Sequence, residues 1–143
     1  MSDCLFTYGT LQPDEAPDEI ASTLAQLRPV GKGFVHGVLY DLGDYPGAVL
    51  DPYSKRRISG TVFRLSGDPI VLRTLDDYEE FDPSAPDKSL FIRKMQPVTL
   101  ASGQTLPCWV YEYNREPGTA PIVTSGGYRK KRHRPKTEAH LSK

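Results

Sequence analysis

The sequence lacks the features that mark several large protein classes. Among its 143 residues are only two cysteines, and no apolar run approaches the roughly 20 residues that a membrane-spanning helix needs. The first residues show neither the basic region nor the apolar core of a secretory signal. The sequence therefore predicts a cytoplasmic protein that does not enter a membrane.

Cysteine and histidine are too sparse for a metal site or a nucleophilic triad. Cys4 and Cys108 match neither a CxxC nor a zinc spacing, so we expect two reduced core thiols rather than a disulfide. Of the three histidines, two lie near the C-terminus, and His36 lies in an apolar segment. Neither a phosphate-binding loop nor a dinucleotide fingerprint is present. These absences favour acid/base chemistry that uses no metal and no cofactor.

Charge is divided unevenly along a chain that is neutral as a whole. Residues 128–143 hold seven basic side chains and one acid, a net charge of +6, so the rest of the chain carries −6. A dense run of like charge with few apolar residues cannot bury enough surface to order itself. We therefore expect one domain over residues 1–127 and a disordered basic tail over residues 128–143. The acidic body argues against nucleic acid as a partner.

The first half of the chain is expected to form one helix and several strands. Apolar residues at helical spacing predict a helix that begins near Pro17 and that Pro29 and Gly31 end. Its inner face would carry Ile20, Leu24 and Leu27. β-prone segments separated by glycine and proline predict an antiparallel meander. Its strands are expected over residues 4–8, 34–40, 48–50 and 58–65.

A second helix and a hairpin are expected in the second half. Asp68 is a good N-cap, and the helix should run to about residue 78 or 80. A proline-containing loop over 81–89 then leads to a hairpin over 90–114, closed near residues 102–103. The sum is an α+β fold of five to seven strands, curled into a small, mostly antiparallel β-barrel with two flanking helices.

Helical geometry separates two adjacent glutamates at the end of the second helix. At about 100° per residue, Glu79 lies within about 40° of Leu72 and Leu75, on the face expected to enter the core. Glu80 falls with Asp76 on the solvated face. Burial would raise the pKa of Glu79 toward the range useful for proton transfer. If the helix frays at its end, Glu79 is instead exposed, and periodicity alone leaves both readings open.

Two further segments could line a site. The segment Tyr8-Gly9-Thr10-Leu11 follows a predicted strand, and successive backbone N–H groups in such a glycine turn can bind a carboxylate. Spacing alone favours an ordinary turn. The last strand places Trp109, Tyr111 and Tyr113 on one face, which is more often core packing, although one hydroxyl could reach a pocket.

Taken together, these segments resemble the γ-glutamylcyclotransferase family, which includes the AIG2-like proteins. The resemblance runs from Leu5 to about Asn114, with its parts in the family's order. The matching strings are YGTL (8–11), VLYDLGDYPG (38–47), LDDYE (75–79), FDP with SLFIR (81–83 and 89–93), and CWVY (108–111). Each string alone is weak, whereas the ordered set at matching spacing is strong.

The resemblance implies a small β-barrel and the cyclisation of a small-molecule γ-glutamyl substrate, which releases 5-oxoproline and needs no cofactor or metal. It assigns the acid/base role to Glu79. The implied substrate-binding residues are Tyr8, Gly9, Thr10, Leu11 and Tyr111.

The chain departs from the family pattern at two positions. Glu80 stands where many members have glycine, and Gln12 replaces a basic residue often seen after the YGTL loop. The alternatives are therefore a non-catalytic module that binds γ-glutamyl ligands and a cyclotransferase specific for γ-glutamylamines. The sequence does not choose among substrates or oligomeric states.

Overall fold

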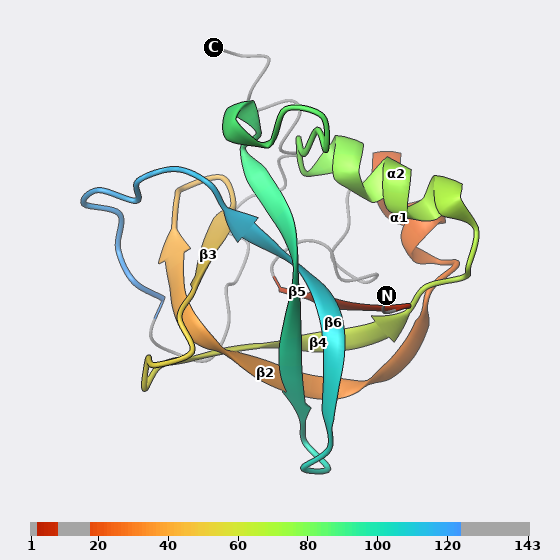
Figure 1. Ribbon diagram of the computed structural model, residues 1–143, viewed down its shortest axis with the longest axis horizontal. Coiled ribbons are helices and arrows are strands. Elements are labelled where there is room, and N and C mark those ends of the chain that lie inside the picture. The colour runs from red at the N-terminus through yellow and green to blue at the C-terminus, as the bar shows by residue number, and fades with distance from the viewer. Residues whose placement is uncertain (1–2, 9–17, 124–143) are drawn as a thin grey trace.

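Strands and helices follow one another in the expected order in the computed structural model, which describes residues 3–8 and 18–123 (Figure 1). Within these ranges the elements are β1 (Cys4–Thr7), α1 (Asp18–Leu24), β2 (Arg28–Asp41), β3 (Pro46–Leu50), β4 (Arg57–Arg64), α2 (Pro69–Tyr78), the short 3₁₀ helix η2 (Pro86–Lys88), β5 (Phe91–Leu100) and β6 (Thr105–Tyr113). The expected helix start at Pro17, the domain boundary at residue 127 and the basic tail lie outside the described residues.

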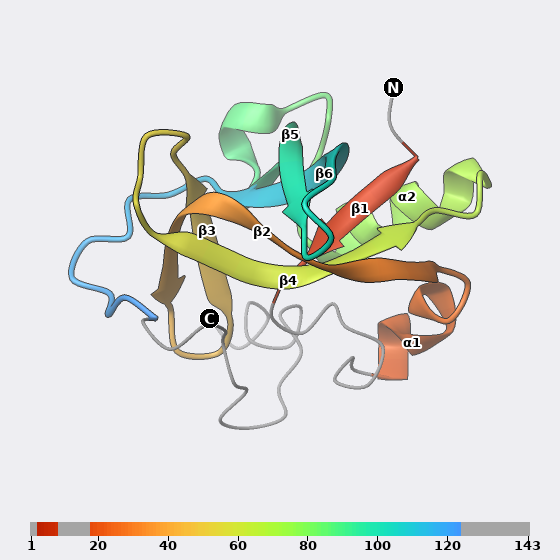
Figure 2. The ribbon, with the colours of Figure 1, turned by 90° about the horizontal axis from the view of Figure 1, so that it is seen from below.

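The sheet closes on itself. Its strand order is β3-β2-β4-β1-β6-β5, and β2 also pairs with β5. Five strands therefore form a closed barrel, and β3 is an additional strand paired with β2 (Figures 1 and 2). The pairs are antiparallel except β1 with β6, which run parallel. The expected α+β fold, with a mostly antiparallel barrel and two helices, is confirmed.

The long strand β2 differs from the expected meander. Its first part pairs with β4, from Arg28 to His36, and its last part pairs with β3, from Gly37 to Asp41. In a meander each strand pairs with the next one along the chain, so β3 would pair with β4. Here β3 and β4 both pair with β2 instead, and the predicted meander is wrong in this detail. At the change of partner, a Cβ on Gly37 would lie 2.5 Å from the carbonyl oxygen of Val49, so glycine permits the close approach.

The residues expected to end the first helix lie inside a strand instead. α1 ends at Leu24, and Pro29 and Gly31 belong to β2, where the register shifts between them. Such a bulge accommodates a proline, which cannot donate to the ladder. The predicted inner face of the helix is confirmed, because Ile20, Leu24 and the following Leu27 are buried.

Two apolar clusters make up the core. The first is built from strand residues alone and includes Phe6, Val62 and Val110, together with Cys4 and Cys108, which form no disulfide. The second joins the outer face of the barrel to the helices and includes Leu5 and Leu75. Alternation along the strands separates the two clusters, since successive side chains point to opposite faces.

Helices α1 and α2 lie on the same side of the barrel (Figures 1 and 2). They contact each other and share the second cluster through Leu24 and Val71. Neither helix of the described ranges is long and apolar enough to cross a membrane. The C-terminal end of α2 is thereby packed against the barrel, where it places the glutamates singled out above.

Candidate active site

Helix α2 has the predicted start. The carboxylate of Asp68 accepts a hydrogen bond from the backbone N–H of Ile70 at 3.0 Å, and Pro69 occupies the first turn. A side-chain oxygen at this position satisfies one of the N–H groups that have no partner within the helix.

Two hydrogen bonds fix the end of α2. The N–H of Glu80 donates to the carbonyl of Asp77 at 3.1 Å, and the N–H of Phe81 donates to the carbonyl of Asp76 at 2.8 Å. This pair is the Schellman motif, in which the residue after the C-cap takes a left-handed conformation. The helix therefore has a defined end, with Tyr78 as its last residue and Glu79 as its C-cap, and does not fray.

Glu79 points into the protein. Its exposed fraction is 2%, so the prediction that it lies on the inner face is confirmed. The buried face of α2 is centred on Val71, Leu75 and Tyr78, whereas Leu72 is only half-buried. A carboxylate at such a position is a group that the fold has withdrawn from water, which is costly unless it is paired or protonated.

Glu80 lies in a different environment from the one expected. Its φ is 58°, the left-handed region that glycine adopts most readily, which gives a physical reason for the glycine often found here. Its side chain is half-buried and not fully solvated. The expectation that Asp76 is solvated is also wrong, because only 6% of that residue is exposed.

Two of the predicted binding residues, Tyr8 and Tyr111, lie close to Glu79. Burial raises the pKa of the Tyr8 hydroxyl well above its usual value, and the charge of Glu79 raises it further. Burial also raises the pKa of Tyr111, followed by the charge of Asp76, the hydrogen bond to Asp76 and the charge of Glu79. Both phenols are therefore neutral near pH 7, in a region where negative charge already acts.

A third phenol, Tyr45, belongs to the same region and was not singled out from the sequence. Burial raises its pKa to about 12, with further contributions from Tyr113, Glu80, Asp44 and Glu79. Tyr45 comes from the loop between β2 and β3, within the DYPG string that resembled the family. That string was the signal available in the sequence. A loop has no helical or strand periodicity, so no local pattern shows that Tyr45 lies near Glu79.

The hydroxyl of Tyr8 connects three strands. It donates to the backbone carbonyl of Tyr111 in β6 and accepts from the backbone N–H of Ala48 in β3, the latter at 3.2 Å. Tyr8 itself directly follows β1. The closed barrel thus brings together two predicted site tyrosines that lie 103 residues apart in the sequence.

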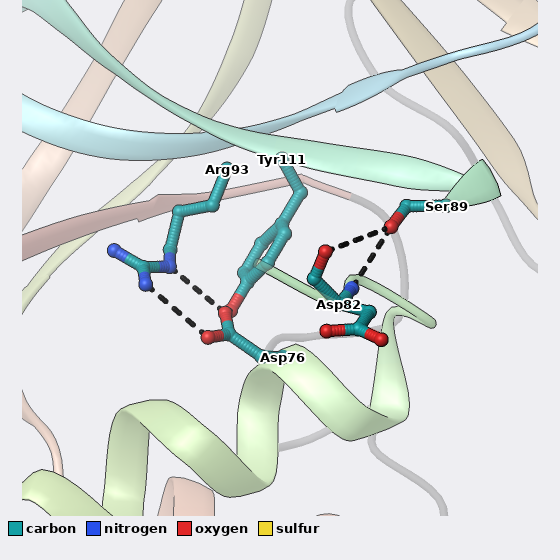
Figure 3. A network of polar contacts seen from close by, with 5 residues as sticks. All are labelled: Asp76, Asp82, Ser89, Arg93 and Tyr111. Carbon is teal, nitrogen blue, oxygen red and sulfur yellow. Dashed lines mark hydrogen bonds and ion pairs between the residues drawn. The ribbon is translucent and has the colours of Figure 1, made fainter. Parts of the chain in front are cut away.

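Whereas Tyr8 binds the backbone carbonyl of Tyr111, Asp76 binds the side-chain hydroxyl of Tyr111 (Figure 3). One carboxylate oxygen of Asp76 accepts from the Tyr111 hydroxyl at 2.7 Å and from Nε of Arg93 at 2.8 Å. The other oxygen accepts from Nη2 of Arg93 at 3.2 Å. The guanidinium also lies over the ring of Trp109, 4.3 Å from its centroid. Sequence reasoning missed this network because it joins α2, β5 and β6, and no local pattern connects them.

The loop after α2 is closed by Ser89, also visible in Figure 3. The N–H of Asp82 donates to the hydroxyl of Ser89 at 2.9 Å. That hydroxyl donates to the carbonyl of Ala85 at 3.1 Å. These contacts fix the chain between Glu79 and β5. They have no evident chemical role beyond that.

Gly9, Thr10 and Leu11 lie outside the described residues, so their binding role stays a prediction. In the part of the chain that the structure describes, no group of three or more His, Cys, Asp or Glu side chains could hold a metal ion. What the described residues bring together is a buried carboxylate beside neutral phenols. Buried carboxyl groups of this kind are suited to accept and return a proton.

Several solved structures share this fold. An AIG2-like protein from Mus musculus matches with a TM-score of 0.72 and 21% identity, covering 94% of this chain and 96% of the other. YkqA from Bacillus subtilis matches with a TM-score of 0.66 and 21% identity over 90% of this chain, which spans 40% of the length of YkqA. A protein named γ-glutamyl cyclotransferase matches with a TM-score of 0.55 and 11% identity, covering 85% and 70% of the two chains.

No curated protein is a significant match to the sequence. The family described as γ-glutamyl cyclotransferase, AIG2-like, matches residues 5–130, which is most of the chain. On this match, the chain belongs to the γ-glutamyl cyclotransferase, AIG2-like family.

Proposed function

We propose that this protein cyclises γ-glutamyl groups by intramolecular aminolysis, releasing 5-oxoproline and an amine or amino acid, with Glu79 as the acid/base residue. The observation that carries the proposal is the burial of the Glu79 carboxylate at the end of α2, beside Tyr8 and Tyr111. Membership of the family supports the reaction type.

The reaction needs a proton to leave the substrate before the ring can close. Glu79 takes a proton from the α-ammonium group, which frees the nitrogen lone pair. The amine attacks the γ-carbonyl carbon, a C–N bond forms within a five-membered ring, and the original C–N bond breaks. In total the α-nitrogen gives up two protons and the departing nitrogen gains two, so Glu79 transfers protons between them and returns to its starting state.

The surroundings of Glu79 suit this role. Tyr8 and Tyr111 are neutral, so they add no negative charge that would compete with the Glu79 carboxylate for the ammonium. A folded γ-glutamyl chain held in a closed site also has its reacting atoms close together, which lowers the entropic part of the barrier. The backbone N–H groups of Gly9 to Leu11 are proposed, from the resemblance, to hold the α-carboxylate or the developing oxyanion.

The proposal is tested by measuring 5-oxoproline release from a substrate panel. The panel contains several γ-glutamyl amino acids, γ-glutamyl-ε-lysine and glutathione. We expect release from at least one member, and the preferred member distinguishes a γ-glutamylamine enzyme from one that acts on γ-glutamyl amino acids. Tight binding of a panel member without release would instead support the non-catalytic module and overturn the enzymatic proposal.

A further inference from the structure

We propose that Asp76 is a positioning residue that accepts the hydrogen bond donated by the Tyr111 hydroxyl, so that the Tyr111 oxygen in turn accepts a hydrogen bond from the α-ammonium group of the substrate. This inference rests on the proposed function and deepens it. It explains why the site would prefer a substrate with a primary ammonium group. It also gives Asp76 and Arg93 a positioning role, although neither touches the substrate.

The direction of the hydrogen bond follows from the chemistry of the two groups. An ionised carboxylate can only accept, so the Tyr111 hydroxyl must donate to Asp76 across their 2.7 Å contact. A phenol has one proton to donate. The remaining lone pairs of the Tyr111 oxygen can then only accept, and a nearby cation with N–H groups is the complementary partner.

The hydroxyl of Tyr8 likewise has its one proton committed to an acceptor within the protein. Its proton is directed to the carbonyl of Tyr111, which can only accept, and its oxygen already accepts from Ala48. Neither Tyr8 nor Tyr111 therefore has a proton left to offer an anionic ligand group. Beside the carboxylate of Glu79, this arrangement of acceptors favours a cationic substrate group over an anionic one.

Arg93 holds the Asp76 carboxylate in place as the acceptor of the Tyr111 hydroxyl. The guanidinium binds both carboxylate oxygens, at 2.8 and 3.2 Å, and such a two-point contact fixes orientation as well as charge. The charged groups that act on Tyr111 are Asp76 and Glu79 from α2, which raise its pKa, and Arg93 from β5, which lowers it. Burial and the two carboxylates prevail, so the phenol retains its proton and Asp76 remains the acceptor.

The ion pair also has access to solvent on its outer side. Asp76 and Arg93 line a groove of about 590 Å³ that Leu72, Phe81 and Pro83 also border. If Asp76 loses its charge, water in this groove can solvate the guanidinium. We therefore expect Asp76→Asn to fold, which makes the role of Asp76 accessible to measurement.

The test compares two ligands that differ only in the ammonium group. The first is the best γ-glutamyl substrate of the panel, and the second is its glutaryl counterpart, which lacks the α-amino group and cannot cyclise. Asp76→Asn is expected to raise KM for the substrate about tenfold or more, the loss typical of a hydrogen bond to a charged group. It should leave the inhibition constant of the glutaryl compound nearly unchanged.

Two further variants make the test specific. Tyr111→Phe should show the same selective loss, and adding Asp76→Asn to Tyr111→Phe should cause little further change, because Asp76 acts through the hydroxyl. Asp77→Asn is the matched control: it removes the same charge from the neighbouring, exposed position of α2, and it should change neither constant. Weakening of both ligands to the same extent by Asp76→Asn, or losses from Asp76 and Tyr111 that multiply, would overturn the inference.

A spectroscopic measurement separates this inference from the proposed reaction. In protein with ¹³Cζ-labelled tyrosine, the Tyr111 signal should titrate at lower pH in Asp76→Asn than in wild type, and should be unmoved in Asp77→Asn. An unmoved Tyr111 signal in Asp76→Asn would overturn the coupling whatever the activity. A wild-type protein that releases no 5-oxoproline from any substrate would overturn the proposed reaction, and the assignment of an ammonium partner with it.

Discussion

At the scale of single residues, the two glutamates that follow α2 differ in burial and in backbone conformation. Glu79, the C-cap, is almost fully buried with φ −83° and ψ 0°, whereas Glu80 is half-buried with φ 58°. A side chain with a β-carbon is disfavoured in that left-handed region. The backbone conformation of Glu80 therefore destabilises the fold, and the burial of Glu79 costs the carboxylate its contact with water.

Replacing Glu80 tests this reading of the helix end. Glu80→Gly should be more stable than Glu80→Ala by about 1 kcal/mol, because both remove the carboxylate and only glycine relieves the left-handed strain. Denaturant unfolding of the two variants gives the difference directly. Equal stabilities would show that the backbone at residue 80 is not strained.

Tyr45 gives a prediction about alkaline stability. Below about pH 10 the phenol is protonated in the folded and unfolded protein alike, so it adds no pH dependence. Between pH 10 and about 12 the unfolded chain loses this proton while the folded protein, with its raised pKa, retains it, so rising pH favours unfolding. Tyr45→Phe should flatten the fall of Tm over this interval. An unaltered fall would place Tyr45 in a more solvated environment than the structure shows.

Asp76 shows where residue-level prediction from sequence ends. Helical phase placed Glu79 correctly because its burial follows from its own helix. The same phase placed Asp76 in solvent, whereas the residue is buried by contacts with Arg93 and Tyr111, 17 and 35 positions further along the chain. A buried charge whose partners come from strands distant in the sequence cannot be recognised from the periodicity of its own helix.

At the scale of elements, the position of Glu79 depends on how α2 begins and ends. The start and the end of α2 were accessible from sequence because each signal is local, namely the N-cap Asp68 and the proline-containing loop over 81–89. β2 was not: its length depends on partners from β3, β4 and β5, and these allow Pro29 and Gly31 within the strand. Local signals therefore predicted both ends of α2, whereas they misplaced the end of α1 and the start of β2.

The N-cap gives a prediction at this scale. Asp68→Ala should lower the free energy of unfolding by about 1 kcal/mol, because the N–H of Ile70 loses its partner. Asp68→Ser, which restores a side-chain oxygen, should recover most of the loss. Chemical denaturation measures both. If the alanine and serine variants are equally stable, the cap contributes nothing to α2.

At the scale of the whole molecule, closure of the barrel assembles the candidate site. β1 lies between β4 and β6, so the residue that follows it, Tyr8, reaches the carbonyl of Tyr111. Helix α2 packs on the outer face and directs Glu79 toward the same region. The family resemblance pointed to Glu79, Tyr8 and Tyr111, which the structure places in one region, and their catalytic and binding roles stay predictions. The barrel's closing pairs could not be derived from strand patterns alone.

The most direct test of the central claim is the rate of 5-oxoproline release by Glu79→Gln, measured beside Glu80→Gln as the matched control. The account predicts that Glu79→Gln folds, binds the substrate and loses at least about 100-fold in kcat, the contribution typical of a general acid/base. Glu80→Gln should retain most of the wild-type rate. An active Glu79→Gln, or an inactive Glu80→Gln beside it, would contradict the account.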